Sequence, residues 1–80
     1  MINDLRLGIY RHFKGKDYKV LGTALHSETK EMMVVYLALY EPYDLWVRPL
    51  SMFQEEVDKP ELDYKGPRFK LVRETFGLGN

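Results

Sequence analysis

The chain has 80 residues, of which 45% are apolar and none is cysteine. This length predicts one domain, residues 1–80 with a core over about 7–73, because a second domain could not enclose a core of its own. Without cysteine, neither disulfides nor cysteine–zinc clusters can stabilise it. Twelve basic and twelve acidic side chains give zero net charge, which counts against nucleic-acid binding.

The sequence also argues against a membrane or secreted protein. No stretch approaches the run of about 20 apolar residues that a membrane span requires. Asp4 and Arg6 stand where a signal peptide needs an unbroken apolar segment. We therefore expect a soluble, cytoplasmic protein with no membrane partner.

Short apolar runs separated by turn residues predict an all-β fold. In chain order, strands are expected over residues 7–13, 18–27, 32–40, 45–49 and 68–72. Gly15 suits a tight turn after the first strand, and Pro42 suits the turn after the third. Pro49 should end the fourth strand, because it cannot donate to a ladder.

The segment before the last strand has a different pattern. Ser51 followed by Gln54 fits a capping box, which predicts one helical turn with Met52 and Phe53 pointing inward. Residues 57–67 carry two prolines and a glycine among charges, which is typical of a loop. Five strands with this helical turn favour a small closed SH3-like barrel. An open sheet packed on a terminal helix is the alternative.

The stretch "HSETKE", residues 26–31, places a histidine, a serine and a carboxylate side by side. Because neighbours on a strand point to opposite faces, His26 and Ser27 should diverge, and the stretch is better read as a hairpin connection. A metal site from His12, His26 and Glu28 is formally possible but close to chance for two histidines. No phosphate loop, dinucleotide loop or cysteine motif accompanies it. We expect no catalytic residues, no metal, no cofactor and no enzyme activity.

The third strand is apolar on both sides and raises the main functional question. Its odd positions, Met33 to Leu39, are aliphatic and predict an inward face. The opposite face would then gather Tyr36, Tyr40, Trp46, Arg48 and His12. Tyrosine, tryptophan and arginine concentrate binding energy at protein contacts, so this face is a candidate site for a peptide or protein segment. Alternatively, these aromatic residues lie under residues 54–66 as a second, minor core. The candidate ligand-binding residues are Tyr36, Tyr40, Trp46, Arg48, His12 and His26.

Nucleic-acid binding is the alternative function. In an SH3-like barrel the first and last strands are neighbours, which would merge the two basic ends of the chain. The patch would comprise Arg11, Lys14, Lys16, Arg68 and Lys70, with Tyr10 available for base stacking. The protein could be a monomer, or a homodimer that covers the tyrosine face of the third strand.

Five stretches, "HFKG", "VLGTALHSET", "VVYLALY", "WVRPLSMF" and "PRF", resemble an uncharacterised family of small bacterial proteins. This family is a conserved domain of unknown function with an SH3-like barrel, and the resemblance covers about residues 8–71. It implies the barrel and a stand-alone bacterial cytoplasmic protein. It supplies no catalytic or ligand-binding residues.

Overall fold

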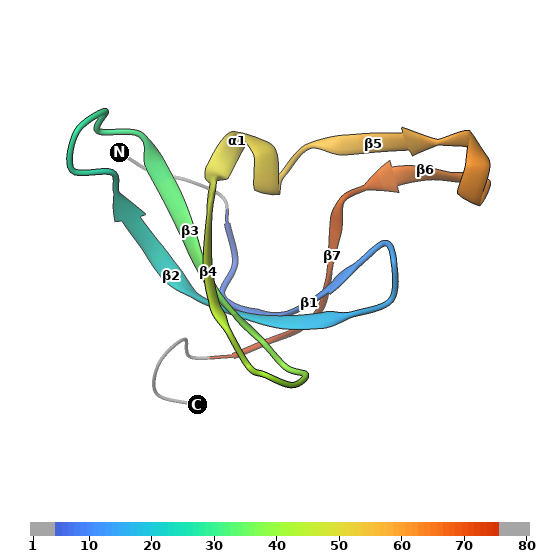
Figure 1. Cartoon of the computed structure of the whole chain (residues 1–80), viewed down its shortest axis with the longest axis horizontal. Helices are drawn as coiled ribbons and strands as arrows, with labels where there is room; N and C mark the ends of the chain where they lie inside the picture. The colour runs from blue at the N-terminus through green and yellow to red at the C-terminus, as the bar shows by residue number, and fades with distance from the viewer. Residues whose placement is uncertain (1–4, 76–80) are drawn as a thin grey trace.

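The structure is a computed structural model, in which residues 5–75 are described. Seven short strands, one helical turn and one 3₁₀ turn make up this part of the chain (Figure 1). In chain order they are β1 (Gly8–His12), β2 (Asp17–Leu25), β3 (Met32–Ala38), β4 (Leu45–Pro49), α1 (Leu50–Phe53), β5 (Glu56–Lys59), η1 (Pro60–Leu62), β6 (Tyr64–Pro67) and β7 (Phe69–Glu74). No helix in residues 5–75 is long and apolar enough to span a membrane.

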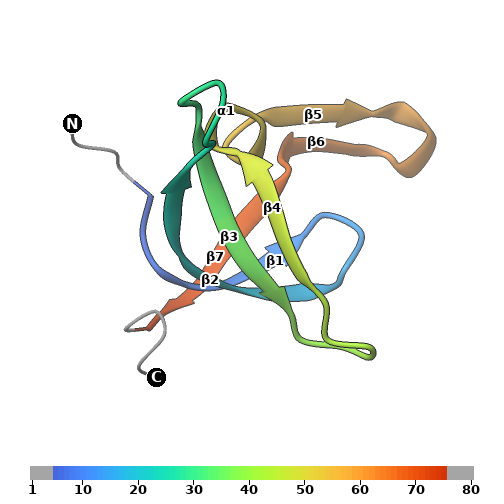
Figure 2. The same ribbon diagram turned by 60° about the vertical axis from the view of Figure 1, so that its left-hand side comes forward.

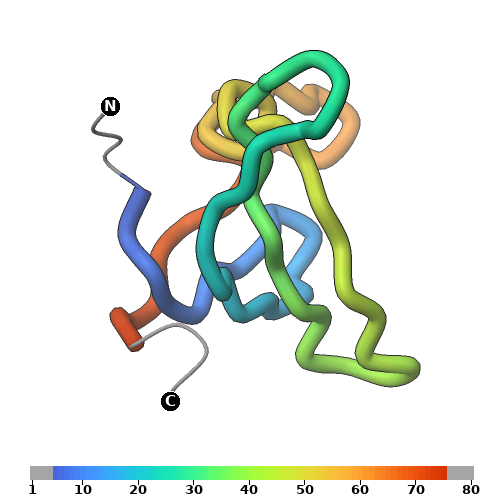
Figure 3. Tube along the Cα trace, turned by 90° about the vertical axis from the view of Figure 1, so that its left-hand side faces the viewer, coloured from blue at the N-terminus to red at the C-terminus, as the bar shows by residue number. Residues whose placement is uncertain are grey.

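Five strands form one antiparallel sheet in the order β4-β3-β2-β1-β7. The first four follow one another through hairpins, and β7 returns to pair with β1. These are the five strands expected from the sequence, so a small, mostly β domain with a short helix is confirmed. The register of β2 on β3 shifts between Val20 and Gly22, and such bulges increase local twist. Figures 2 and 3 show the sheet curling around its inner side.

The curled sheet does not close, which corrects the expectation of a closed barrel. Within residues 5–75, β4 pairs with β3 and β7 pairs with β1, and no ladder joins β4 to β7. The physical reason lies in the chain after β4. It turns at once into α1 and then runs out into β5 and β6, so β4 is not carried alongside β7. α1 lies between two strands, so the alternative of a sheet on a terminal helix is also wrong for the described residues.

Residues 56–67 form a hairpin arm, β5–η1–β6, where the sequence predicted a loop over 57–67. Pro60 begins the 3₁₀ turn at the tip, where a missing N–H does no harm, and Asp63 closes it with a left-handed backbone. Gly66 pairs with Val57. The prolines and glycine therefore lie where they do not break the ladder. Figure 1 shows the arm extending away from the five-stranded sheet.

The core lies on the inner side of the sheet and is mainly aromatic. It contains Tyr10, Val20, Val34, Tyr36, Phe53 and Phe69. The rings of Phe53 and Phe69 stack 4.2 Å apart, and Tyr36 meets both edge-on. Phe53 thus plugs the interior as expected, whereas Met52 is 44% exposed and does not. The capping box is also wrong, because α1 begins at Leu50 with Pro49 before it and has no side-chain cap.

The face of β3 that points inward is the opposite of the one predicted. Val34, Tyr36 and Ala38 are buried, while Met33, Val35 and Leu37 are half-buried on the outer side and Leu39 is exposed. Large rings fill the concave side of a small, curled sheet more completely than aliphatic side chains do, so the tyrosine face became the interior.

Candidate functional site

The inner side of the sheet reaches solvent along β4, where a group of aromatic and basic side chains lies. We call these residues the edge cluster: His12, Lys16, Tyr18, Tyr36, Tyr40, Trp46, Arg48 and Phe69. β4 positions two of them. Trp46 lies opposite Tyr36 in the register, and Arg48 lies opposite Val34. Because directly paired residues share a face, Trp46 and Arg48 both project toward the inner side.

Arg48 links the edge cluster to the core. It is half-buried, its Nε donates to the Tyr36 hydroxyl at 3.3 Å, and its guanidinium carbon lies 6.0 Å from the centre of the Phe69 ring. Three other arginines pair with carboxylates: Arg6 with Glu74, Arg11 with Asp17 and Arg68 with Glu55. No carboxylate within residues 5–75 forms an ion pair with Arg48. A partly buried cation without a counterion is unfavourable, so Arg48 is ready to accept one.

His12 lies on the β7 side of the cluster. Its Nδ1 accepts the backbone N–H of Lys14 at 3.1 Å, and its ring meets Phe69 edge-on with centroids 5.0 Å apart. Desolvation by burial lowers the pKa of His12, and the cationic groups of Arg68, Arg48 and Lys14 lower it further. Burial and the neighbouring cations therefore both favour the neutral form of His12.

Two phenols and a lysine complete the cluster beyond the end of β3. The hydroxyls of Tyr18 and Tyr40 hydrogen-bond to each other, and the Lys16 ammonium lies 4.9 Å from the centre of the Tyr40 ring. Desolvation raises the pKa of Tyr18, and the hydrogen bond with Tyr40 raises it further. The Tyr18 hydroxyl therefore stays protonated near neutral pH and can donate or accept a hydrogen bond.

Five of the six predicted ligand-binding residues come together here, but their exposure differs. Trp46 is 47% exposed, Arg48, Tyr40 and His12 are half-buried, and Tyr36 is 4% exposed. Tyr36 is thus a residue of the main core that positions Arg48. It is covered, as the alternative expected, but its ring partners are Phe53 and Phe69 rather than a second, minor core under residues 54–66. Sequence reasoning missed Tyr18 and Phe69, and it assigned Lys16 to the basic patch instead. The pairing of β1 with both neighbouring strands is what brings them near His12.

His26 does not join the edge cluster. It follows the last residue of β2, whereas His12 lies opposite the start of that nine-residue strand. Its Nδ1 accepts the backbone N–H groups of Glu28 at 3.1 Å and Thr29 at 3.3 Å, so it organises the turn between β2 and β3. The hairpin reading of "HSETKE" is confirmed. In the described part of the chain, no three His, Asp or Glu side chains are grouped to hold a metal ion.

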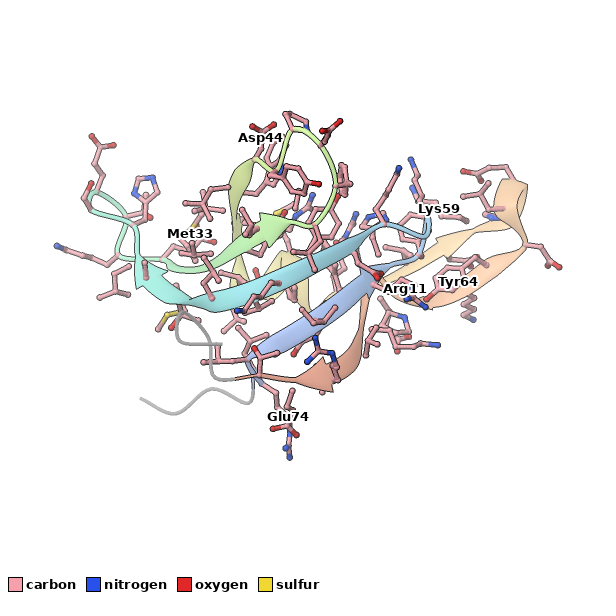
Figure 4. The ribbon with its side chains drawn as sticks, turned by 90° about the horizontal axis from the view of Figure 1, so that it is seen from below. Arg11, Met33, Asp44, Lys59, Tyr64 and Glu74 are labelled. Atoms are coloured by element: carbon pink, nitrogen blue, oxygen red, sulfur yellow. The ribbon has the colours of Figure 1, made fainter. Side chains whose placement is uncertain are left out.

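A second surface lies on the outer side, between β1, β7 and the arm. Arg11 and Lys70 are register partners, and both line a hollow of about 200 Å³ with Phe13 and Tyr64, whose rings stack 5.4 Å apart. Figure 4 shows Arg11 on β1 beside Tyr64 on β6. The predicted basic patch is only partly formed. Arg11 is bonded to Asp17 at 2.7 Å, and Tyr10 is buried and cannot stack on a base.

Comparison with known proteins places the chain among relatives over most of its length. Residues 8–71 match the profile of the family described as "Protein of unknown function (DUF1653)". The fold is similar to the crystal structure of a protein belonging to DUF1653 from Bordetella bronchiseptica, with a TM-score of 0.80 and 39% sequence identity. That similarity covers 90% of this chain and 92% of the other. No curated protein matches significantly.

Proposed function

The chain belongs to the DUF1653 family, and from its surface we propose that it is a non-catalytic module that holds a peptide or protein segment against the edge cluster. We also infer that the fold is an SH3-like barrel whose last ladder is left open. The strand order supports this: a four-stranded meander, a helical turn, and a last strand that returns to the first.

The observation that carries the proposal is that Trp46 and Arg48 share the inner face of β4 at an open edge of the sheet. Trp46 exposes 47% of its surface, and Arg48 beside it has no carboxylate partner in residues 5–75. Tryptophan and arginine side chains that lie together at a surface are typical of binding hot spots. The outer edge of β4 leaves backbone groups unpaired, and an extended peptide can use such an edge to add a strand.

Trp46 is the one tryptophan of the chain, so its fluorescence reports on the site directly. A library of extended peptides is titrated against the protein, and Trp46 emission and calorimetric heat are recorded. We expect Trp46→Ala to weaken the calorimetric affinity of a bound peptide by about 30-fold, the loss of a typical hot spot of about 2 kcal/mol. Leu25→Ala is the matched control. Leu25 is also a large apolar side chain and is 61% exposed, but it is the last residue of β2, whereas Tyr18 of the edge cluster lies near the start of that strand.

Equal losses in both variants would locate binding elsewhere and overturn the assignment of the edge cluster. A library in which no member changes the emission or releases heat would overturn the proposed function itself.

Nucleic-acid binding is the second candidate, favoured by the hollow that Arg11, Lys70, Phe13 and Tyr64 line. Phosphate contacts there would make affinity for single-stranded RNA fall steeply with salt. We expect Lys70→Gln to weaken binding by about threefold and to lower the salt slope, while Lys30→Gln in the β2–β3 turn changes neither. An affinity that is flat between low and physiological salt would overturn this candidate.

A further inference from the structure

Resting on the proposed function, we propose that the segment bound at the edge cluster is acidic. It would add as a strand to β4 and place a glutamate or aspartate side chain against Arg48. The ligand is thus an extended polypeptide segment that has an acidic residue opposite Arg48 and apolar residues on either side of it.

The charges around the cluster argue for an anion. Lys16 lies over Tyr40, Arg48 over Phe69, and Lys14 and Arg68 act on His12 from the turn after β1 and from the start of β7. Among the described residues, the ion pair that these four groups form is that of Arg68 with Glu55, at 2.7 Å. Arg68 Nε is buried and has no acceptor among the described residues. Around the edge cluster, hydrogen-bond donors with positive charge therefore outnumber carboxylate acceptors, and one added carboxylate would offset this imbalance.

The position of Arg48 on an edge strand argues for a polypeptide rather than a nucleic acid as the source of that anion. A strand added to β4 places one of its side chains directly opposite Arg48, at a Cβ separation of about 5 Å, where opposite charges attract. A nucleic acid has no peptide groups to pair with the free edge. Leu45 and Val47 alternate with Arg48 and are 61% and 59% exposed on the outer side. Apolar residues flanking the acidic one would cover them.

His12 gives the site a second readout. A bound carboxylate would reduce the positive surrounding that lowers the pKa of His12, so binding should raise that pKa toward its ordinary value. By linkage, affinity should then increase as pH falls through the titration of His12, until the acidic residue of the peptide itself protonates at about pH 4.3.

The test uses three blocked, extended peptides that alternate valine with glutamate, glutamine or lysine. We expect the glutamate peptide to bind about tenfold more tightly than the glutamine peptide, and the lysine peptide to bind least. Arg48→Gln should abolish the difference between the first two, and Arg48→Lys should keep part of it. Arg73→Gln is the control, because Arg73 is exposed on β7 away from β4. The His12 titration, followed by NMR, should shift upward with the glutamate peptide and not with the glutamine peptide.

The outcomes separate this inference from the function on which it rests. If glutamate and glutamine peptides bind equally and Trp46→Ala still weakens both, the acidic requirement is overturned and the module remains. If none of the three peptides binds, both the acidic requirement and the proposed function are overturned. If inorganic phosphate at matched concentration displaces the glutamate peptide and shifts His12 alike, the site is a phosphate site and the polypeptide assignment is overturned.

Discussion

At the scale of single residues, Phe53 makes several of the ring contacts that hold the core together. Its side chain is 2% exposed and contacts the rings of Tyr10, Tyr36 and Phe69. We expect Phe53→Ala to lower the free energy of unfolding by about 4 kcal/mol, through lost burial and the cavity that remains. Met52→Ala, the neighbour with an exposed side chain, should change it by less than about 0.5 kcal/mol. Urea unfolding of both variants checks this, and equal losses would contradict the packing described.

His12 makes stability depend on pH. Its pKa in the folded protein lies below the ordinary 6.5, so the unfolded chain takes up a proton first as pH falls. The free energy of unfolding should therefore be highest above pH 6.5 and decline below it, until the folded pKa is passed. In His12→Asn, whose amide oxygen can replace the Nδ1 acceptor, the decline that begins below pH 6.5 should be smaller. Denaturant unfolding across this range measures it, and an unchanged pH profile would contradict the assignment.

At more acidic pH, the free energy of unfolding depends on a different group, the carboxyl of Asp17. The Arg11 guanidinium donates to Asp17 and lowers the pKa of that carboxyl below its ordinary 3.8. Stability from this pair is present above pH 3.8 and lost as pH falls further, so the two effects can be told apart by pH.

Residue patterns predicted which side chains share a face, but not which face is inside. Alternation along β3 and β4 correctly grouped Tyr36 with Trp46 and Arg48, because that follows from strand geometry. The choice of interior depends on how the sheet curls and on what covers it, and those are tertiary properties. Tyr36 was therefore proposed as a ligand-binding residue, with a covered position as the alternative, and it is a buried core residue.

At the scale of elements, Gly8 permits the close pairing of β1 with β7. A Cβ at this position would lie 2.2 Å from the Arg73 carbonyl oxygen and 2.9 Å from the Glu74 Cα, and both are backbone atoms. Gly8→Ala must therefore move one strand, next to the register shift between Ile9 and Tyr10. We expect a loss of about 2 kcal/mol in the free energy of unfolding.

Gly22→Ala is the matched control for that prediction. Gly22 is also in a strand beside a register shift, but a Cβ there meets nothing within 4 Å. Thermal unfolding of the two variants should separate them by about 8 °C for a domain of this size. A Gly8 variant as stable as the Gly22 variant would mean that β1 and β7 are less closely paired than the structure shows.

The sequence predicted the five sheet strands because each is a short apolar run ended by turn residues. It missed the arm because Val57 is the one buried side chain among charged neighbours in β5, so no alternation is visible there. Pro60 and Gly66 added a loop pattern that in fact marks a hairpin tip and a strand pair. Closure of the barrel was expected because exposed edges are unfavourable, and this general rule did not hold for β4.

At the scale of the whole molecule, the fold places its two candidate surfaces on opposite sides of the sheet. Inward-facing residues of β4 build the edge cluster, and outward-facing residues of β1 and β7 build the hollow beside the arm. His12 borders both, because its ring packs on Phe69 on one side and on Phe13 on the other. Substituting His12 would therefore disturb both surfaces, which is why Trp46 and Lys70 are the better residues for separating the two candidate functions.

The arm should be the least stable part of the described chain. β5 and β6 pair with each other and not with the five-stranded sheet, and a two-stranded hairpin by itself is marginally stable in water. The Arg68–Glu55 ion pair lies at its base, and the ring of Tyr64, the first residue of β6, stacks on Phe13, whereas Leu62 at the tip is 52% exposed.

We therefore expect amide hydrogen exchange to be at least about tenfold faster in the arm than at Val20 and Val34, whose side chains are fully buried. Tyr64→Ala should speed exchange at Val57 and Gly66 further, because it removes the stack on Phe13, and should leave Val20 unchanged. Mass spectrometry of exchanged peptides resolves the two regions. Equal protection of arm and sheet would show that they open as one cooperative unit, and the arm would then have to be held by more than these two contacts.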